Sequence, residues 1–311
     1  MDGTHAIGVD LGGTKILAGV VARDGTIVRR HERPTPTSSQ RELIGEIDAA
    51  VSELMDERVG AIGLGVPGPI DQRRGRVIFA TNLPLADFDL RDRMQDEFRI
   101  PVGFDNDANA AAIGEWQAGA GRGCSNVLMI TLGTGVGGGV IVDGVPFRGG
   151  AGAGGELGHV TVIAGGDPCH GSCEGRGHLE AYITGVAATK RAQEAFGPAA
   201  DAHRLVRLAN EGDETAKRIL GEIGALLGYG IASHANVFNP EVIVVGGGFG
   251  IAAWEHLIPE AERIFQRECL VPAKHDARIV PGELGTAGGL IGAAFVGFEA
   301  LDAAESLDAA R

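Results

Sequence analysis

Hydrophobic positions along the chain follow two periods, which predicts strands interleaved with helices. An apolar run over residues 6–11 ends in two glycines, a second run covers residues 16–21, and Asp24-Gly25 is a hairpin turn signal. The chain therefore opens as three strands joined by two turns. Further strands are predicted over residues 59–66, 102–104, 127–132, 140–142, 242–245 and 278–280.

Apolar residues at helical spacing predict the helices. After Ser39 and Glu42, which are typical of a capping box, apolar residues from Leu43 to Leu54 fall on one helical face. Helices are also predicted over residues 90–98, 107–118, 185–196 and 213–238, after the glycines at 246–248, and from Thr286. Such interleaving indicates an α/β protein.

One order of elements occurs twice. Strand, glycine turn, strand and turn follow one another at residues 9–25 and again at 127–144, where glycines 133–139 are read as the turn. This repetition predicts two related halves, with a boundary near residues 119–124. Residues 149–178 are rich in loop formers.

Composition adds an excess of glycine. There are 51 glycines among 311 residues, roughly twice the usual share of about 7%. Neither a Gly-X-Y period nor Gly/Ser tracts occur, which excludes collagen and flexible linkers. Glycine is favoured where the backbone takes a positive φ or approaches another group closely. The excess therefore predicts backbone close to ligands.

Charge, cysteines and apolar stretches exclude several classes. The net charge is −14, and the basic run at residues 73–76 is read as a solvated turn, so we expect no nucleic-acid partner. Four cysteines make no disulfide scaffold and favour the cytoplasm. No signal peptide is expected. Residues 123–142 carry no charge, but their glycines and polar side chains favour a buried strand and loop, so we expect no membrane partner.

The first glycine turn carries groups that suit a phosphate. Asp10 at the end of the first strand is followed by Gly12, Gly13, Thr14 and Lys15. Backbone N–H groups in such a turn can point at a phosphate, and the hydroxyl and the ammonium add further donors. The Asp10 carboxylate suits a hydrated Mg²⁺. A plain hairpin turn is the alternative, and the polar neighbours favour phosphate binding.

The second glycine turn resembles a dinucleotide motif only in spacing. Gly133, Gly135 and Gly138 match G-x-G-x-x-G, but that fold needs a helix immediately after the glycines. Here a strand and a turn follow. We therefore reject NAD binding and predict a second phosphate hairpin at Thr134 and Gly135.

Polar residues gather where the strand over residues 102–104 meets the next helix. Asp107 stands near the helix N-terminus, where a carboxylate is favoured. This suits a residue that accepts a proton from a hydroxyl during phosphoryl transfer. Helix capping by Asp105 or Asn106 is the alternative.

The loop-rich region contains possible zinc ligands. These are His159, Cys169, Cys173 and His178. Two thiols and two imidazoles can make a tetrahedral site, for which His170 is a competing ligand. Glu156 and Glu180 can accept hydrogen bonds from vicinal hydroxyls. Free thiols in a mobile loop are the alternative.

Together these motifs resemble the ROK family of sugar kinases, in the actin-like ATPase superfamily with the hexokinases. The resemblance covers residues 10–294, and its most specific pieces are the first glycine turn and Glu156-Leu157-Gly158-His159. It implies a two-domain α/β actin-like ATPase fold, ribonuclease H-like, with a central cleft. The implied domains are residues 1–118, completed by a helix over 298–311, and residues 119–297.

The resemblance also implies residue roles. The family's catalytic base matches Asp107, and Asp10 is placed with the nucleotide and Mg²⁺. The sugar contacts match Gly68, Asn82, Asn106, Asp107, Glu156, His159 and Glu180. The nucleotide contacts match Gly12, Gly13, Thr14, Lys15, Thr134, Gly135, Gly247 and Gly248.

The chain departs from the family's pattern at the metal. The family has C-x-C-G-x-x-G-C-x-E, with the histidine of the earlier motif as fourth ligand. Cys173, Gly177 and Glu180 keep their places, but His178 replaces the third cysteine and Cys169 lies two residues early. We expect structural zinc on a Cys₂His₂ set; loss of the metal is the alternative.

The resemblance implies ATP-dependent phosphorylation of a hexose at its 6-hydroxyl, with glucose as the first candidate, in a homodimer or homotetramer. Fructose, mannose and N-acetylhexosamines are alternative substrates, and polyphosphate is an alternative donor. The rival functions are a sugar-responsive ROK repressor, which needs a DNA-binding segment, and a sugar-binding or structural actin-like protein. Asp107 beside two phosphate turns argues against the last.

Overall fold

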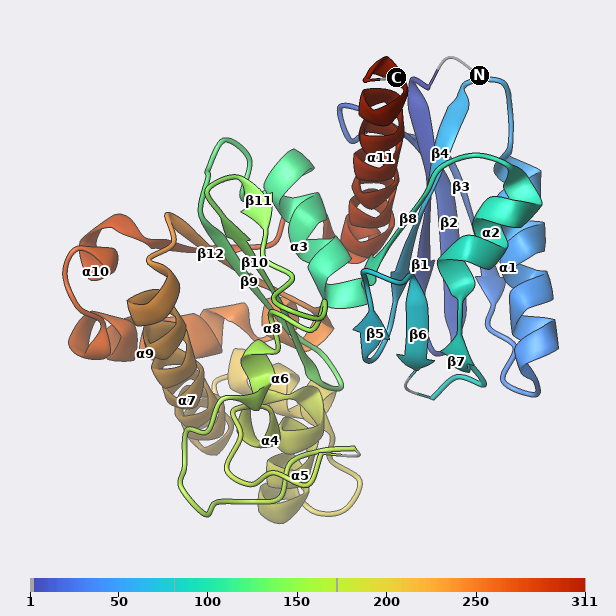
Figure 1. The fold of residues 1–311 in the computed structure, drawn as a ribbon. Coiled ribbons are helices and arrows are strands. Elements are labelled where there is room, and N and C mark those ends of the chain that lie inside the picture. Colours follow the sequence, from blue (N-terminus) through green and yellow to red (C-terminus); the bar gives the residue numbers. More distant parts are fainter. Residues whose placement is uncertain (1–2, 81, 172, 311) are drawn as a thin grey trace. The chain divides into compact units, whose positions relative to one another are not determined.

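The computed structural model describes residues 3–80, 82–171 and 173–310. The chain separates into two compact units, and Figure 1 shows a sheet with helices in each of them. The first unit comprises Met1–Gly123, Pro146–Gly155 and Thr286–Arg311. The second unit comprises Cys124–Val145 and Glu156–Gly285.

The first unit contains a five-stranded sheet of order β3-β2-β1-β4-β8. Its strands are β1 (His5–Leu11), β2 (Lys15–Ala22), β3 (Ile27–Pro34), β4 (Val59–Val66) and β8 (Val102–Asn106). The first three form an antiparallel meander, whereas β4 pairs parallel with both β1 and β8. This confirms the predicted three-strand opening. It also brings the carboxyl ends of β1, β4 and β8 to one edge, where the polar motifs follow.

Helices cover both faces of this sheet (Figure 1). They are α1 (Gln40–Leu54), α2 (Leu90–Phe98), α3 (Asp107–Ala118) and α11 (Gly288–Ala309). The hydroxyl of Ser39 caps α1 by accepting a hydrogen bond from the backbone N–H of Glu42, which confirms the predicted cap. The apolar face of α1 packs on one side of the sheet and α11 on the other.

Glycines in three neighbouring strands let α11 approach the sheet closely. A Cβ on Gly63 of β4 would lie 1.7 Å from the carbonyl oxygen of Ala293, and one on Gly8 of β1 would lie 2.1 Å from that of Leu290. Gly103 of β8 faces α11 in the same way, at 2.0 Å. Any larger residue would force the helix away. Part of the glycine excess therefore serves packing inside the first unit, where backbone meets backbone.

The contacts divide the chain somewhat differently from the predicted domains. The first unit ends at Gly123, then recurs at Pro146–Gly155, and contains all of α11. The helix stays whole because its glycine-lined contacts with the sheet begin in its first turn. Domains at residues 1–118 with 298–311, and at 119–297, stay a prediction.

Among the described helices, Gly285–Ala309 is long and apolar enough to cross a membrane, with a mean hydropathy of 1.3. Of its most apolar window, 56% is buried inside the protein, as in a core helix.

The first unit also has a small three-stranded sheet, which the sequence did not predict because its strands are short. The strands are β5 (Ile70–Asp71), β6 (Arg76–Phe79) and β7 (Ala86–Phe88).

The sheet of the second unit has the order β11-β10-β9-β12-β13 and repeats that of the first. Its strands are β9 (Val127–Leu132), β10 (Val136–Val142), β11 (Val145–Pro146), β12 (Val242–Gly246) and β13 (Arg278–Pro281). As in the first unit, a hairpin is followed by parallel strands, since β9 pairs antiparallel with β10 and parallel with β12. The two predicted halves are therefore related in topology.

The predicted second glycine turn was too long. Strand β10 begins at Val136, so Gly137, Gly138 and Gly139 are paired strand residues opposite β9. The turn itself contains only Gly133, Thr134 and Gly135. A strand follows the glycines, which confirms that the dinucleotide fold does not apply.

Helices pack on the sheet of the second unit around one core (Figure 1). They are α4 (Glu180–Ile183), α5 (Gly185–Phe196), α6 (Ala202–Asn210), α7 (Glu214–Phe238), α8 (Gly248–Ala252), α9 (Trp254–Glu268) and α10 (Ala273–Asp276). Helices α7 and α9 lie side by side. A Cβ on Gly224 of α7 would lie 2.3 Å from the carbonyl oxygen of Leu257, so this glycine permits the close contact.

Candidate active site

The first glycine turn joins β1 to β2, and a threonine side chain stabilises it by a hydrogen bond to its backbone. The N–H of Gly12 donates to the carbonyl of Lys15 at 3.0 Å, and the Gly12 carbonyl accepts from the hydroxyl of Thr35 at 2.7 Å. Gly13 and Thr14 are exposed. The turn is thus fixed on one side and open on the other, as a phosphate site requires. Thr35 was not singled out in the sequence.

Lys15 at the end of this turn is half-exposed and pairs with Glu32 on β3, with its Nζ 2.7 Å from the carboxylate. An exposed ion pair of this kind contributes little to stability. The ammonium can therefore exchange this partner for a phosphate at small cost.

Asp10 occupies the end of β1 under strong electrostatic influence. Burial, and then the nearby carboxylate of Asp107, raise the pKa of Asp10 to about 6, although Lys15 acts in the opposite direction. A Cβ on Gly289, in the first turn of α11, would lie 2.4 Å from the Asp10 carboxylate, so glycine leaves room for it. Two carboxylates close enough to interact in this way are suited to share a divalent cation.

The junction between β8 and α3 brings together two predicted sugar contacts. Asn106 caps α3, and its side-chain oxygen accepts from the N–H groups of Ala108 at 2.9 Å and Asn109 at 3.3 Å. Its amide donates to the carbonyl of Gly68 at 3.3 Å. The capping alternative is therefore confirmed for Asn106. The cap also fixes Asp107, the first residue of the helix.

One residue that supports this junction, Arg148, was not singled out in the sequence. Asp105 is fully buried, and its carboxylate accepts from the guanidinium of Arg148 at 2.6 Å. Arg148 lies in a loop after β11, outside any strand or helix, so no hydrophobic period or motif marks it in the sequence. Asn82, another predicted sugar contact, is exposed between β6 and β7 with φ of 62°. Its neighbour Thr81 lies outside the described residues.

The second glycine turn is supported by backbone and by one carboxylate. Gly133 N–H donates to the carbonyl of Gly135 at 3.0 Å, while the Gly133 carbonyl accepts from the N–H of Gly185 at 2.9 Å. The carboxylate of Glu180 accepts from the N–H of Val136 at 2.8 Å. A Cβ on Gly135 would lie 2.9 Å from that carboxylate, so any larger residue there would push against the side chain of Glu180. Thr134 remains exposed.

Glu180 therefore lies between the second glycine turn and the cysteine loop. One oxygen bonds to Val136, and the other lies 3.8 Å from the Sγ of Cys169. The side chain is buried. This placement makes Glu180 a structural support of the turn, and its predicted role as a sugar contact stays a prediction.

A third glycine pair lies at the end of β12. Gly247 has φ of 81°, and a Cβ there would lie 2.4 Å from the carbonyl oxygen of Leu132. This close approach places the loop beside the end of β9, where the second glycine turn begins. Gly248 is exposed. Both predicted nucleotide elements of the second unit thus lie at the carboxyl edge of its sheet.

The four predicted zinc ligands converge. The ligand atoms of His159, Cys169, Cys173 and His178 all lie within 4.8 Å of one another. The Nδ1 atoms of the two histidines are 3.3 Å apart, and each lies near one sulfur, at 3.6 Å for Cys169 with His159 and 3.5 Å for Cys173 with His178. His170 is not in the set.

The three distances of 3.3, 3.5 and 3.6 Å match the edges of a zinc tetrahedron. With Zn–N of about 2.0 Å and Zn–S of about 2.3 Å, tetrahedral geometry places two nitrogens about 3.3 Å apart and a nitrogen and a sulfur about 3.5 Å apart. Burial, and next the neighbouring Cys173, raise the pKa of the Cys169 thiol to about 11, although the backbone N–H of His170 lowers it. A cation at the centre would reverse this preference for the thiol. The residues present therefore fit Zn²⁺.

His159 offers its second nitrogen to Glu156. Its Nε2 lies 3.8 Å from the Glu156 carboxylate, while its Nδ1 faces the cysteines. A metal on Nδ1 fixes the proton on Nε2. One imidazole can thus act as a zinc ligand and as a hydrogen-bond donor to a substrate hydroxyl.

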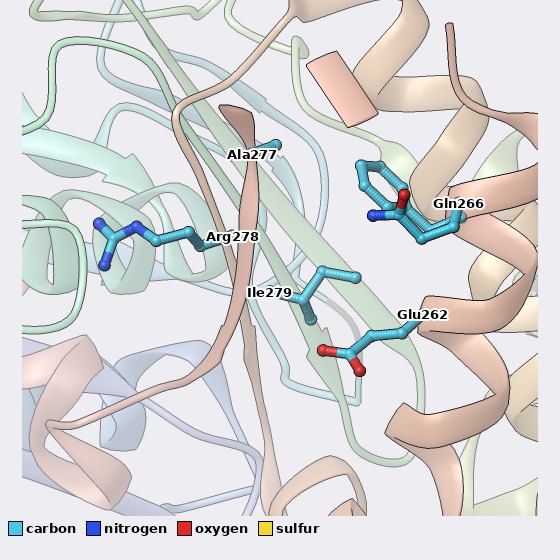
Figure 2. Close-up of a pocket in the computed structure, with 6 residues that line it drawn as sticks. Glu262, Gln266, Ala277, Arg278 and Ile279 are labelled. Carbon is cyan, nitrogen blue, oxygen red and sulfur yellow. The ribbon is translucent and has the colours of Figure 1, made fainter. Parts of the chain in front are cut away.

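A pocket of about 350 Å³ lies elsewhere in the second unit, between α9 and β13. Figure 2 shows Arg278 pointing away from Glu262, so the two opposite charges do not converge on a ligand. The pocket contains neither a glycine turn nor a predicted zinc ligand. It is not part of the candidate site.

Comparison with known proteins agrees with this arrangement. The model of the ROK family matches residues 6–298. A glucokinase of Halalkalibacterium halodurans is 36% identical over 311 aligned residues, which cover 92% of each chain. The crystal structure of a ROK family glucokinase from Streptomyces griseus, in complex with glucose and AMPPNP, has a TM-score of 0.80 at 33% identity and covers 95% of this chain and 99% of that one.

A different kind of relative is also similar. The xylose repressor of Bacillus subtilis is 32% identical over 247 aligned residues, which cover 78% of this chain and 63% of the repressor. The glucokinase, in contrast, is matched over nearly its whole length. With a family model that matches most of its length, this chain belongs to the ROK family and has the mixed α/β fold of the actin-like ATPases.

Proposed function

We propose that this protein transfers the γ-phosphate of MgATP to the 6-hydroxyl of a hexose, and that glucose is its preferred substrate. The enzyme class is that of an ATP-dependent sugar kinase. The observation that carries the finer proposal is the start of α3, where capped Asn106 precedes Asp107 and the carboxylate of Asp10 lies close enough to interact with Asp107.

Asp107 is the general base in this proposal. Its position at the positive end of the α3 dipole favours the carboxylate. As the 6-oxygen bonds to the γ-phosphorus, the bond to the ADP oxygen breaks and the hydroxyl proton passes to Asp107. In phosphoryl transfer, positioning of such a base matters more than its strength.

The nucleotide side uses both glycine turns. Gly12, Gly13 and Thr14 offer backbone and hydroxyl donors, and Lys15 adds a positive charge. Thr134 and Gly135 with Gly247 and Gly248 supply the equivalent backbone groups in the second unit. Asp10 would hold a hydrated Mg²⁺, which when bound neutralises the charge on the phosphates.

Glu156 and His159 are proposed to bind the sugar. A carboxylate acceptor and an imidazole donor at 3.8 Å suit two neighbouring hydroxyls of a hexose. Zinc on the Cys₂His₂ set would fix the orientation of His159 and of the loop that follows it. In the first unit, Gly68 and Asn106, which are linked by a hydrogen bond, are also proposed to bind the sugar.

The test is the specificity constant kcat/KM for glucose, fructose, mannose, N-acetylglucosamine and N-acetylmannosamine with MgATP, measured by coupled ADP release. Glucose should have the highest value, and ³¹P NMR should place the phosphate on the 6-oxygen. A higher kcat/KM for another hexose would make that hexose the preferred substrate instead of glucose. A higher rate with polyphosphate would make polyphosphate the phosphate donor instead of ATP. If none is phosphorylated and a DNA operator is bound in a salt-sensitive gel shift, the repressor function is correct instead.

A further inference from the structure

We propose that Arg148 is a positioning residue for phosphoryl transfer, which holds the start of α3 in place through the buried carboxylate of Asp105. The proposal rests on the proposed function, in which Asp107 of the same helix accepts the proton. Arg148 does not act on substrate itself; its effect passes through its contact with Asp105.

Asp105 directly precedes Asn106 and Asp107. Its hydrogen-bond partners Asn106, Asn109 and Arg148 all belong to the first unit. Its side chain is fully buried. One oxygen accepts from the N–H of Asn106 at 2.8 Å and from the side-chain amide of Asn109 at 3.2 Å. The other accepts from Nε of Arg148 at 2.6 Å. A carboxylate this buried needs a cationic partner, and Arg148 is the one the structure provides.

The guanidinium of Arg148 joins two elements of the unit at once. While Nε bonds Asp105 on β8, Nη2 bonds Glu299 on α11 at 2.7 Å. The side chain is 19% exposed, so water competes little for these bonds. The two bonds use separate nitrogens of one planar guanidinium, an arrangement that the single ammonium of lysine cannot reproduce.

The segment that carries Arg148 is itself fastened to the first unit. It comprises Pro146–Gly155, and the chain on either side belongs to the second unit. The N–H of Gly154 donates to the carbonyl of Arg148 at 3.0 Å. Gly152 has φ of 87°, and a Cβ there would lie 2.5 Å from the Cβ of Gln72. The arginine therefore reaches Asp105 from a fixed backbone.

The consequence for catalysis follows from the order of residues. Asp105 holds the backbone N–H of Asn106, Asn106 caps the helix, and Asp107 is the first residue in it. Releasing the Asp105 carboxylate frees the turn that sets the direction of the Asp107 side chain. A misplacement of about 1 Å can cost about 10²-fold in rate. The same segment leads directly to Glu156, so its release also affects the proposed sugar contacts.

The competing explanation is that this ion-pair network only stabilises the fold. Such a role lowers the melting temperature but leaves kcat normal in the fraction that is folded. A positioning role lowers kcat in folded protein. The double variant Arg148→Met with Asp105→Asn separates the two, because it removes the guanidinium and the charge of its buried partner together. The Glu299 carboxylate that also loses its partner is 40% exposed, so water can solvate it.

The experiment measures kcat and KM for glucose and MgATP in Arg148→Ala, Arg148→Lys and the double variant, with the folded fraction from circular dichroism. Arg23→Ala is the matched control, since Arg23 also pairs with an α11 carboxylate, that of Asp302, but at the surface. We expect kcat to fall about 10²-fold for Arg148→Ala, to stay low in the double variant even when its melting temperature recovers, and to change little in the control. Added guanidinium ion should restore part of the kcat of Arg148→Ala.

Two results would overturn the positioning role. One is normal kcat in folded Arg148→Ala. The other is recovery of kcat together with stability in the double variant, which stays available if Arg148→Ala fails to fold. Wild-type enzyme is assayed first with every hexose of the panel. If it phosphorylates none, the proposed function fails and this proposal fails with it, whereas an active wild type with unaffected variants rejects Arg148 alone.

Discussion

The two halves of the chain have the same strand order around a glycine turn, yet the two turns differ in chemistry. The first turn lies between Asp10 and Lys15, and the Asp10 carboxylate interacts with Asp107. The second turn has neutral residues at its tip. One buried carboxylate, that of Glu180, accepts a hydrogen bond from the backbone of Val136 at the end of this turn. The shared topology fixes where a turn lies, and the residues at the strand ends decide what it can bind.

This difference assigns separate tasks to the two units. Charged groups in the first unit suit a cation and a proton transfer, both of which need carboxylates. Backbone groups in the second unit suit phosphate oxygens, and its Cys₂His₂ set would hold a loop in place when a metal binds to it. This division of tasks can be tested in two ways, by removing charge from the first turn or by disturbing the residues that support the second.

Among changes to the two turns and their supports, Asp10→Asn should have the largest effect, because it removes the proposed Mg²⁺ ligand. We expect kcat with MgATP to fall at least about 10²-fold, in the range of losses that follow removal of one strong electrostatic contact. In the wild type, kcat/KM for MgATP should fall as the pH drops below about 6, since a protonated Asp10 cannot bind the cation. The pH profile of kcat/KM checks this. A profile that is flat from pH 5 to pH 7 would contradict the role of Asp10.

The same substitution should stabilise the protein without magnesium. A folded pKa of about 6, above the usual 3.8 of an aspartate, means that the folded state binds more protons than the unfolded state between these values. Stability from this group is therefore present at low pH and is lost as the pH rises to about 6. This difference in pKa corresponds to at most about 3 kcal/mol. The melting temperature of Asp10→Asn minus that of the wild type should rise from pH 4 to pH 7.

Removal of zinc comes next in size. We expect about one zinc per chain by elemental analysis, and Cys173→Ser should abolish it. Without the metal His159 loses its fixed orientation, so KM for glucose should rise about 10–100-fold, as for losses of support around a metal site, while KM for MgATP changes much less. Cys124→Ser, outside the ligand set, is the matched control. Equal changes in both KM values would show that the metal supports the whole unit instead.

Gly135→Ala should have the smallest of these effects. Its new Cβ would lie 2.9 Å from the Glu180 carboxylate and would disturb the bond by which this carboxylate holds Val136 at the end of the second turn. KM for MgATP should rise about tenfold, equivalent to about 1.4 kcal/mol of binding free energy, with little change in KM for glucose. Gly221→Ala on α7 is the control, because its Cβ would meet only an ordinary contact at 3.5 Å. An unchanged KM for MgATP would remove the second turn from the nucleotide site.

The sequence predicted elements better than it predicted side-chain partners. Strand β4 and helices α2, α3 and α5 have the predicted bounds, because turn residues and caps mark their ends. The four converging Cys and His side chains could be predicted because cysteine and histidine are conspicuous in a loop.

What the sequence did not reveal depends on long-range contact. Arg148 meets Asp105 across 43 positions, and Glu180 meets Val136 across 44. Neither pairing has a local period. The extent of β10 was misjudged because glycine is disfavoured in strands and was read as turn. The glycines that face α11 likewise show their purpose only once the helix lies on the sheet.

The most direct test of the central proposal is the rate of glucose 6-phosphate formation by Asp107→Asn at saturating glucose and MgATP, with the dissociation constant of glucose measured separately. Asp92→Asn, an exposed position on α2, is the control. The account predicts that Asp107→Asn lowers kcat by about 10²–10⁴-fold and leaves the dissociation constant of glucose nearly unchanged. A kcat within about threefold of the wild type would contradict the assignment of Asp107 as the base.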